Sequence, residues 1–257
     1  MSSMTVRSMT IDRMRVHVFE SNQQLGQKVA DDVAAHISSL VKQQGKTAMI
    51  MATGNSQLTF IEALRRLEDV PWDRVTLFHM DEYLGMSSEH PASFARFIRE
   101  EVVDLVHPAT FYPIRGNAID INAELERYRR LFRESPPDIC VMGIGENGHL
   151  AFNDPPANFE SKEVIHVVNL DERCRMQQVN EGHFASLDEV PSRAYSLTVP
   201  ALLNVKFALV AVPELRKAEA VKTALRGPVT PHCPASILRT KPNVTLYLDQ
   251  QSASQLQ

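Results

Sequence analysis

The 257-residue chain has little of what marks secreted or membrane-spanning proteins. It has only three cysteines, Cys140, Cys174 and Cys233, which lie far apart and form no CxxC pair. A scattered, odd set of cysteines excludes a disulfide framework and a zinc ribbon, and it indicates a reducing compartment. The longest apolar runs, such as residues 207–212, are far shorter than the roughly 20 residues that a membrane-spanning helix needs.

The chain also lacks an excess of basic residues. Its 27 lysines and arginines face 31 acidic residues, for a net charge of −4. This balance argues against nucleic acid as the main partner, although a small phosphorylated ligand needs only a few local donors. The first residues are polar and lack the apolar core of a signal peptide. We therefore expect a cytoplasmic protein that binds neither nucleic acid nor a membrane.

No repeat, low-complexity tract or Gly/Ser linker divides the chain, so we expect a single domain over residues 1–257. Short β-branched runs alternate with longer amphipathic stretches, which predicts an α/β fold: one open, Rossmann-like, mostly parallel sheet with helices on both faces. The expected strands are 15–19, 47–51, 75–80, 139–144, 194–199, 207–212 and 244–248, and the expected helices are 22–42, 58–67, 91–103, 121–132 and 214–225. The polar, weakly periodic segment 154–191 is expected to be a long excursion that acts as a lid.

Ligands bind open α/β sheets at the carboxyl ends of the strands, and the first such segment is MATGNSQ, residues 51–57. Gly54 permits a sharp turn, and Thr53, Asn55 and Ser56 supply hydroxyl and amide groups at a helix start, where backbone N–H groups attract anions. The same residues also suit an ordinary strand-to-helix turn capped by Ser56. The segment alone therefore leaves phosphate binding and a structural turn as alternatives.

The second segment is HMDEYLG, residues 79–85. Two adjacent carboxylates at a strand end, beside an aromatic residue, are unusual as structure alone, although a solvated Asp81 and a helix-capping Glu82 remain the alternative. In a partly dry site the pKa of Asp81 rises, and the residue can move a proton between neighbouring carbons of a sugar.

The third segment is GIGENGHLAFND, residues 143–154. Its glycines permit close approach of the backbone to a ligand, and His149 follows them directly. Glu146 and Asp154 lie near enough in sequence to orient the imidazole ring. A purely structural histidine is the alternative.

Taken together, these segments resemble the glucosamine-6-phosphate deaminases and, more distantly, the 6-phosphogluconolactonases. The motifs MDEYLG, followed by EHP, and GxGxxGHxAFN carry the resemblance, which extends from about residue 15 to residue 250. It implies conversion of an amino-sugar 6-phosphate and water into a ketose phosphate and ammonia, with no cofactor and no metal. It further implies that Asp81 shuttles the proton between C2 and C1, that His149 assists ring opening, and that the 53–56 turn and Lys217 hold the phosphate.

The chain departs from the pattern of these deaminases around the histidine and in the lid. Asn147 stands where they commonly have an aspartate, and Asp154 stands where they have a glutamate. Because an amide cannot accept a proton, Glu146 or Asp154 is expected to supply the missing charge. Gln178 falls near the place of a phosphate-binding arginine, which leaves Arg173 and Arg175 as its substitutes.

Two other functions remain open at this stage: a 6-phosphogluconolactonase with His149 as base, and a sugar-phosphate sensor without catalysis. The lactonases tend to have DER and PDGH where this chain has DEY and ENGH. Retention of Asp81 and His149 argues against a sensor. The chain ends soon after its last expected strand, so we expect a monomer or a small homo-oligomer. The sequence does not distinguish glucosamine from galactosamine 6-phosphate.

Overall fold

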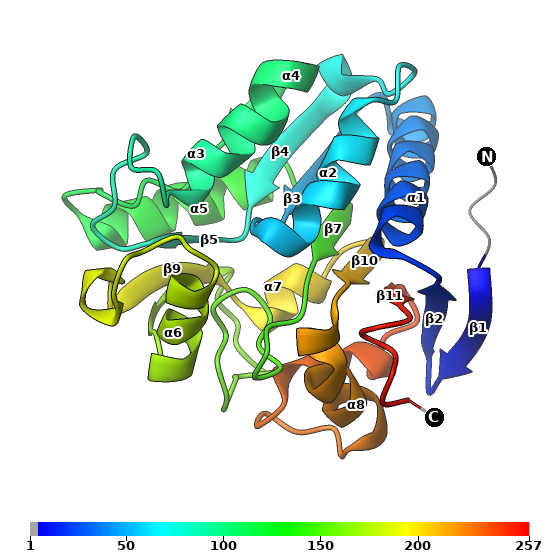
Figure 1. Cartoon of the computed structure of the whole chain (residues 1–257). Coiled ribbons are helices and arrows are strands. Elements are labelled where there is room, and N and C mark those ends of the chain that lie inside the picture. Colours follow the sequence, from blue (N-terminus) through cyan, green and yellow to red (C-terminus); the bar gives the residue numbers. More distant parts are fainter. Residues whose placement is uncertain (1–4, 257) are drawn as a thin grey trace.

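Two β-sheets organise the computed structural model of the chain, which describes residues 5–256 (Figure 1). In spatial order the large sheet consists of β1 (Thr5–Ile11), β2 (Met14–Phe19), β11 (Val244–Asp249), β10 (Phe207–Val212), β7 (Ile139–Met142), β3 (Thr47–Met51), β4 (Val75–His79) and β6 (Thr110–Tyr112). All neighbours pair in parallel except β1 and β2. The predicted α/β fold with a mostly parallel sheet is therefore confirmed.

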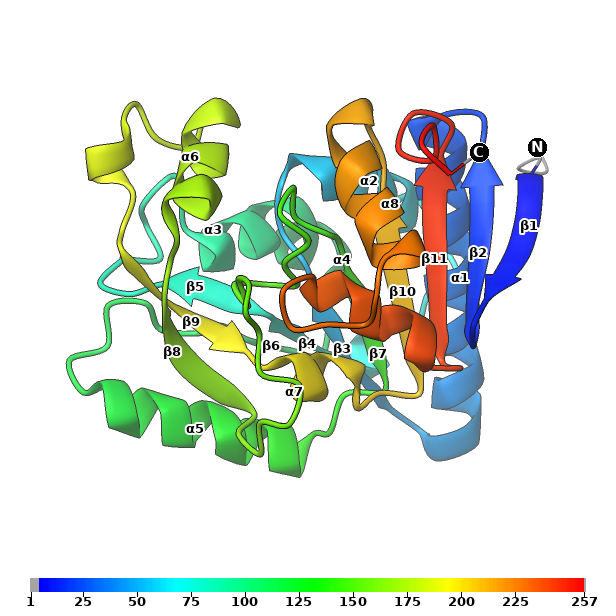
Figure 2. The ribbon, with the colours of Figure 1, turned by 90° about the horizontal axis from the view of Figure 1, so that it is seen from below.

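Helices cover both faces of this sheet (Figures 1 and 2). Successive side chains of its buried strands are apolar and point to opposite faces, so both faces must be covered. In β3, Ala48 and Ile50 belong to one core cluster, and Met49 and Met51 belong to the other. One face carries α1 (Asn22–Gln44), α2 (Leu58–Arg65), α3 (Phe94–Ile98), a π-helical turn (Arg99–Val103) and α4 (Asp104–Val106). The opposite face carries α5 (Ile121–Glu134), α7 (Val199–Leu203) and α8 (Ala218–Arg226).

The first helix shows how closely local sequence fixes an element. Ser21 caps α1 by accepting a hydrogen bond from the Gln24 N–H, and Gly45 ends it with φ +82°. Its predicted apolar face is buried: Leu25, Val29, Val33, Ile37 and Leu40 are each at most 3% exposed. Caps and periodicity agree here, so the predicted range 22–42 falls only two residues short.

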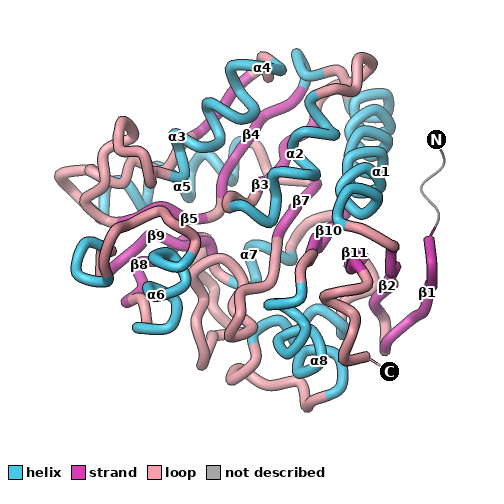
Figure 3. Tube along the Cα trace, viewed as in Figure 1, coloured by secondary structure: helices cyan, strands magenta, loops and turns pink. Residues whose placement is uncertain are grey.

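A second sheet, whose pairing the sequence did not predict, takes one of its strands from the lid (Figure 3). It consists of three antiparallel strands in the order β5 (Asp81–Tyr83), β9 (Arg193–Leu197) and β8 (Ile165–Asn169). The expected lid segment 154–191 therefore contains β8 and α6 (Glu172–Asn180), although its composition gave no clear periodicity. A small apolar cluster that includes the aromatic residues Tyr83, Phe94, Phe152 and Phe184 packs the lid against β5.

Other differences from the predicted elements have local causes. The helix expected at 91–103 begins at Phe94, because Ser93 supplies its cap, and then widens into the π-helical turn. The short strands β1 and β6 have partly exposed side chains and were not predicted. Within residues 5–256, no helix combines the length and apolarity that crossing a membrane would require.

The order of the strands determines where a ligand can bind. From β3 the chain proceeds outward through β4 to β6, and it then returns to the other side of β3 at β7. Adjacent strands whose connections run in opposite directions leave a crevice at their carboxyl ends. The strands β10, β7, β3 and β4 are consecutive neighbours around this point, so the segments that follow them share one edge of the sheet.

Candidate active site

One cavity at the carboxyl edge of the sheet brings together six residues that the sequence singled out. It is lined by Thr53, Gly54, Ser56, Asp81, His149 and Lys217. These side chains come from the ends of four neighbouring strands, so the topology accounts for their meeting. The predicted residues Asn55, Glu146, Asn147, Asp154, Arg173 and Arg175 are not among those that line the cavity.

Asp81 faces the cavity from the first position of β5 and is 7% exposed. Burial, with a smaller contribution from the neighbouring Glu82 carboxylate, raises the pKa of Asp81 to about 8. At neutral pH the side chain is therefore mostly protonated and can gain or lose a proton near the pH of the cell.

Glu82, the second acid of the pair, has a structural role. Its carboxylate accepts hydrogen bonds from the Ser93 hydroxyl at 2.7 Å and from the backbone N–H groups of Tyr83, Phe94 and Ala95 at 2.9 to 3.3 Å. It therefore caps the start of α3. The two adjacent carboxylates thus divide between a capping residue and a residue in the cavity.

His149 packs against the Gly-rich loop that precedes it. A methyl group at Gly145 would lie 2.2 to 2.4 Å from three atoms of the imidazole ring, so only glycine leaves room for the ring. The His149 Nδ1 atom lies 3.2 Å from Asp154 Oδ1, although its N–H is not well aligned for a hydrogen bond. Asp154 thus lies beside the ring as the sequence suggested.

Asn147 connects this histidine to the lid. Its side-chain amide donates to Asp154 Oδ1 at 3.0 Å and to Asp171 Oδ2 at 3.4 Å, while its oxygen accepts from the His149 backbone N–H. Asp171 is the N-cap of the lid helix α6. Burial favours the neutral form of Asp154, but the adjacent His149 ring and the hydrogen bond from Asn147 outweigh it and lower the pKa of Asp154 below its usual value.

The turn after β3 presents the groups expected for an anion site. Gly54 has φ +97°, and the hydroxyl-bearing residues Thr53 and Ser56 line the cavity on either side of it. Gln57, only 1% exposed, fixes the turn by donating to the Ala211 carbonyl at 3.2 Å. Asn55 points elsewhere, with its amide 3.5 Å from the Glu181 carbonyl in the lid.

Lys217 reaches the same cavity from the turn between β10 and α8. It is 3% exposed, and burial, assisted by the nearby Arg216 charge, lowers the pKa of its ammonium. An almost buried cation that lines a cavity in this way is suited to bind an anionic group.

The lid contributes amides and an acid in place of an arginine. Gln177, Gln178 and Glu181 of the α6 region line the cavity. The Arg175 guanidinium donates to the Leu187 and Val190 carbonyls within the lid. Arg173 lines a separate small cavity next to Glu146.

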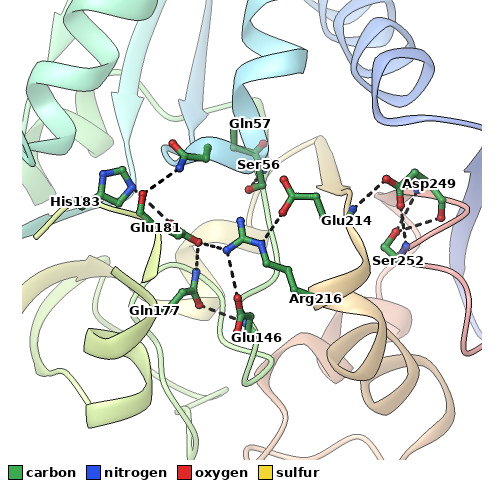
Figure 4. A network of polar contacts seen from close by, with 11 residues as sticks. Ser56, Gln57, Glu146, Gln177, Glu181, His183, Glu214, Arg216, Asp249 and Ser252 are labelled. Atoms are coloured by element: carbon green, nitrogen blue, oxygen red, sulfur yellow. Dashed lines mark hydrogen bonds and ion pairs between the residues drawn. The ribbon is translucent and has the colours of Figure 1, made fainter. Parts of the chain in front are cut away.

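Glu146 and Arg216 belong to a polar network beside the cavity (Figure 4). The Arg216 guanidinium contacts the carboxylates of Glu146, Glu181 and Glu214. The sequence did not single out Glu181 or Arg216, because the three segments that they join are far apart along the chain.

His149 belongs to a cluster of three residues whose side chains are of the types that bind metal ions. One ligand atom each of His149, Asp154 and Cys174 fall within 4.8 Å of one another. Burial raises the pKa of the Cys174 thiol strongly, and the nearby carboxylates add to this effect. Asp154 of this group lies beside the His149 ring and accepts a hydrogen bond from Asn147, so it helps to position the imidazole.

The chain is similar to known proteins over most of its length. The family described as glucosamine-6-phosphate isomerases/6-phosphogluconolactonase matches residues 20–247. A glucosamine-6-phosphate deaminase of Oenococcus oeni is 33% identical over 95% of this chain and 99% of its own length. A second one, from Exiguobacterium sibiricum, is 37% identical over 80% of each chain.

Solved structures show the same fold. A structure described as a monomeric glucosamine-6-phosphate deaminase has a TM-score of 0.85 and 31% identity, and the match covers 94% of this chain and all of that one. A 6-phosphogluconolactonase from Shewanella baltica has a TM-score of 0.77 at 17% identity, over 94% of this chain and all of the other. The second likeness concerns the fold alone.

Proposed function

Because this chain belongs to the family of glucosamine-6-phosphate isomerases and 6-phosphogluconolactonases, we propose that it converts glucosamine 6-phosphate or its galactosamine analogue, with water, into the ketose 6-phosphate and ammonia. The relatives at 33 to 37% identity are named glucosamine-6-phosphate deaminases. The observation that carries the proposal is that Asp81, His149 and Lys217 line one cavity. Two of these groups can transfer protons, and the third is a buried cation.

In this proposal the phosphate binds at the turn after β3 and to Lys217. The hydroxyls of Thr53 and Ser56 and the backbone of Gly54 provide neutral donors, and the Lys217 ammonium provides the charge. A phosphate fixed at this end holds the sugar carbons in place against the catalytic groups, which lowers the entropic part of the barrier.

His149 opens the sugar ring. Its imidazole donates a proton to the ring oxygen while the C1 hydroxyl loses its proton, so the C1–O5 bond breaks and an open-chain aldehyde forms. The Asp154 carboxylate, anionic because of its lowered pKa, stabilises the protonated ring and limits its rotation. Gly145 leaves the room that the ring occupies.

Asp81 then performs the isomerisation. Its carboxylate removes the proton from C2 while the C2 ammonium gives one proton to O1, so the aldehyde becomes an enolamine. The same carboxyl group then returns the C2 proton to C1, which gives a protonated imine at C2. Water adds to the imine carbon, the C2–N bond breaks, and ammonia leaves with the proton of the added water. The raised pKa of Asp81 makes the residue a stronger base than an exposed aspartate.

The test is release of ammonia from glucosamine 6-phosphate and galactosamine 6-phosphate, with 6-phosphogluconolactone as the competing substrate. Asp81→Asn should reduce turnover by a factor of at least about 10², since a positioned acid–base group contributes roughly 10²–10⁴-fold. Binding of phosphate should change little, because Asp81 lies outside the phosphate end. Asp73→Asn is the matched control, since Asp73 is an exposed carboxylate outside the cavity.

Full turnover in the Asp81→Asn variant would contradict the assigned role. Lactone hydrolysis without ammonia release would place the chain with the lactonases of the family. Binding of the amino-sugar phosphate with no turnover of any substrate would identify a sensor.

We also propose that the protein acts as a monomer. The similar structure at 31% identity is described as a monomeric deaminase, which supports this assignment. Light scattering of the purified protein, with and without glucosamine 6-phosphate, measures its mass directly; a dimeric mass in both conditions would contradict it.

A further inference from the structure

Arg216 is surrounded by carboxylates from three separate segments (Figure 4). Its guanidinium lies 2.5 Å from Glu181 in the lid, 2.6 Å from Glu214 in its own turn and 3.3 Å from Glu146 in the Gly-rich loop. The side chain of Glu181 is 9% exposed and that of Arg216 is 30% exposed. The pair therefore joins the lid to the edge of the main sheet in a partly desolvated place.

Glu181 itself lines the cavity, together with Lys217 and the anion turn. Burial favours its neutral form, but hydrogen bonds from His183, Arg216 and Gln177 outweigh it and lower the pKa of Glu181 to about 2. The carboxylate is thus charged at every pH at which the enzyme would work. An uncompensated negative charge at this position would repel a phosphate.

The two partners are held in place from opposite sides. In the lid, the Gln177 amide donates to Glu181 Oε1 at 2.9 Å. In the turn, Glu214 has φ +82°, a strained value for a residue other than glycine, and its N–H donates to Asp249 Oδ2 at 3.0 Å. Ser252 in turn donates its N–H to the same carboxylate group. Arg216 therefore extends from a braced turn toward a braced lid residue.

We propose that Arg216 is a positioning residue that sets the affinity for phosphate by neutralising Glu181 and holding the end of the lid helix over the cavity. Arg216 is not among the residues that line the cavity, so it acts through Glu181 and not by direct contact with the ligand. The inference rests on the proposed function in one respect, since it takes the anion at Lys217 to be a phosphate. The inference also names an arginine that serves the phosphate-binding side of the cavity. In the lid, Gln178 stands near the place of the expected arginine, and Arg173 and Arg175 point elsewhere.

The test is a double-mutant cycle on the full-length protein, with Arg216→Met, Glu181→Gln and the two combined. Calorimetry gives the dissociation constant of inorganic phosphate, and ammonia release gives KM and kcat for glucosamine 6-phosphate. Arg129→Met is the matched control, because Arg129 forms a 2.6 Å ion pair with Glu163 at 26% exposure on the remote helix α5. Thermal unfolding of each variant reports whether the fold is retained.

We expect Arg216→Met to weaken phosphate binding about tenfold, because one unit charge close to the ligand becomes uncompensated in a site of intermediate dielectric constant. KM should rise by a similar factor and kcat should change little. The combined variant should return to within about threefold of the wild type, since removing both charges restores the balance. Arg129→Met should have no effect.

Three results would overturn the inference. If the combined variant bound phosphate as weakly as Arg216→Met, Arg216 would itself be the phosphate ligand. If Arg216→Met left phosphate affinity and KM unchanged, the ion pair would have no role in binding. If the wild type did not bind phosphate at all, the ion pair could not set the affinity for phosphate. In a further outcome, the variants show the expected changes in phosphate affinity while no amino-sugar phosphate releases ammonia. That outcome would refute the proposed function but would support the role of Arg216 in phosphate binding.

Discussion

Replacing Asp81 by asparagine should make the protein more stable at alkaline pH while it destroys activity. The pKa of Asp81 rises from 3.8 to about 8 in the fold, chiefly because of burial. Between these two values the folded protein keeps the proton and the unfolded chain has lost it. The contribution of Asp81 to the free energy of unfolding is therefore greatest below about pH 4 and is lost as the pH rises through about 8. Asparagine has no such proton to lose.

The expected size follows from the shift. Each unit of pH between the two pKa values costs about 1.4 kcal/mol, so the three units from pH 5 to pH 8 cost about 4 kcal/mol. The free energy of unfolding of Asp81→Asn, minus that of the wild type, should increase by this amount across the range. Glu82 is present in both proteins, so its own titration largely cancels in the difference.

Urea denaturation at half-unit steps from pH 5 to pH 8, followed by circular dichroism, measures this difference. Asp73→Asn serves as the control, because its exposed carboxylate is solvated in the folded and the unfolded chain alike. Parallel curves for the wild type and Asp81→Asn over the whole range would refute the reasoning, since they would mean that Asp81 is ionised in the fold without cost.

Three further predictions concern catalysis. If Asp81 must be ionised in the free enzyme, kcat/KM for ammonia release should rise about tenfold per pH unit below about 8 and level off above it, and a flat profile from pH 6 to 9 would exclude Asp81 as the base. Gly145→Ala should reduce kcat by about 10²-fold with phosphate affinity retained, because its methyl group displaces the His149 ring, and a crystal structure of the variant would show whether the ring has moved. Asn147→Asp should reduce kcat about tenfold at pH 8 and less at pH 6, because the new carboxylate adjoins Asp154 and Asp171; kcat at or above that of the wild type at both pH values would contradict this.

The sequence predicted the part of the fold that depends on local pattern. Buried runs such as β3 and β10 have the bounds that their apolar character indicated, and α1 has its caps within its own sequence. Because parallel strands end at one edge of a sheet, residues after β3, β4, β7 and β10 could be expected to meet. Asp81, His149, the turn at Gly54 and Lys217 do line one cavity.

What the sequence could not predict depends on contacts between distant segments. A helix-capping Glu82 was only one alternative at the sequence level, because the run MDEY does not show that Ser93 and the following backbone reach its carboxylate. The pair of Arg216 and Glu181 spans 35 residues and exists only because the lid folds back over β10. Of the three strands of the second sheet the sequence predicted only β9, as a strand over 194–199. The strands β5 and β8 were missed, and so was the pairing, because the three segments lie far apart in the chain.

Two buried ionisable groups of the cavity indicate which ligand completes it. Lys217 is an almost buried cation, and Asp81 is a buried carboxyl group whose pKa burial raises, with a smaller contribution from the Glu82 carboxylate. A ligand of opposite charge would stabilise the ionised form of each group, because the fold has already removed both groups from water. An amino-sugar phosphate carries both charges, with the phosphate for Lys217 and the ammonium at C2 for Asp81, and its ammonium would favour the ionised base that the reaction needs. A phosphorylated lactone offers only the negative charge and would leave Asp81 protonated, so the pocket favours deamination over lactone hydrolysis on electrostatic grounds alone.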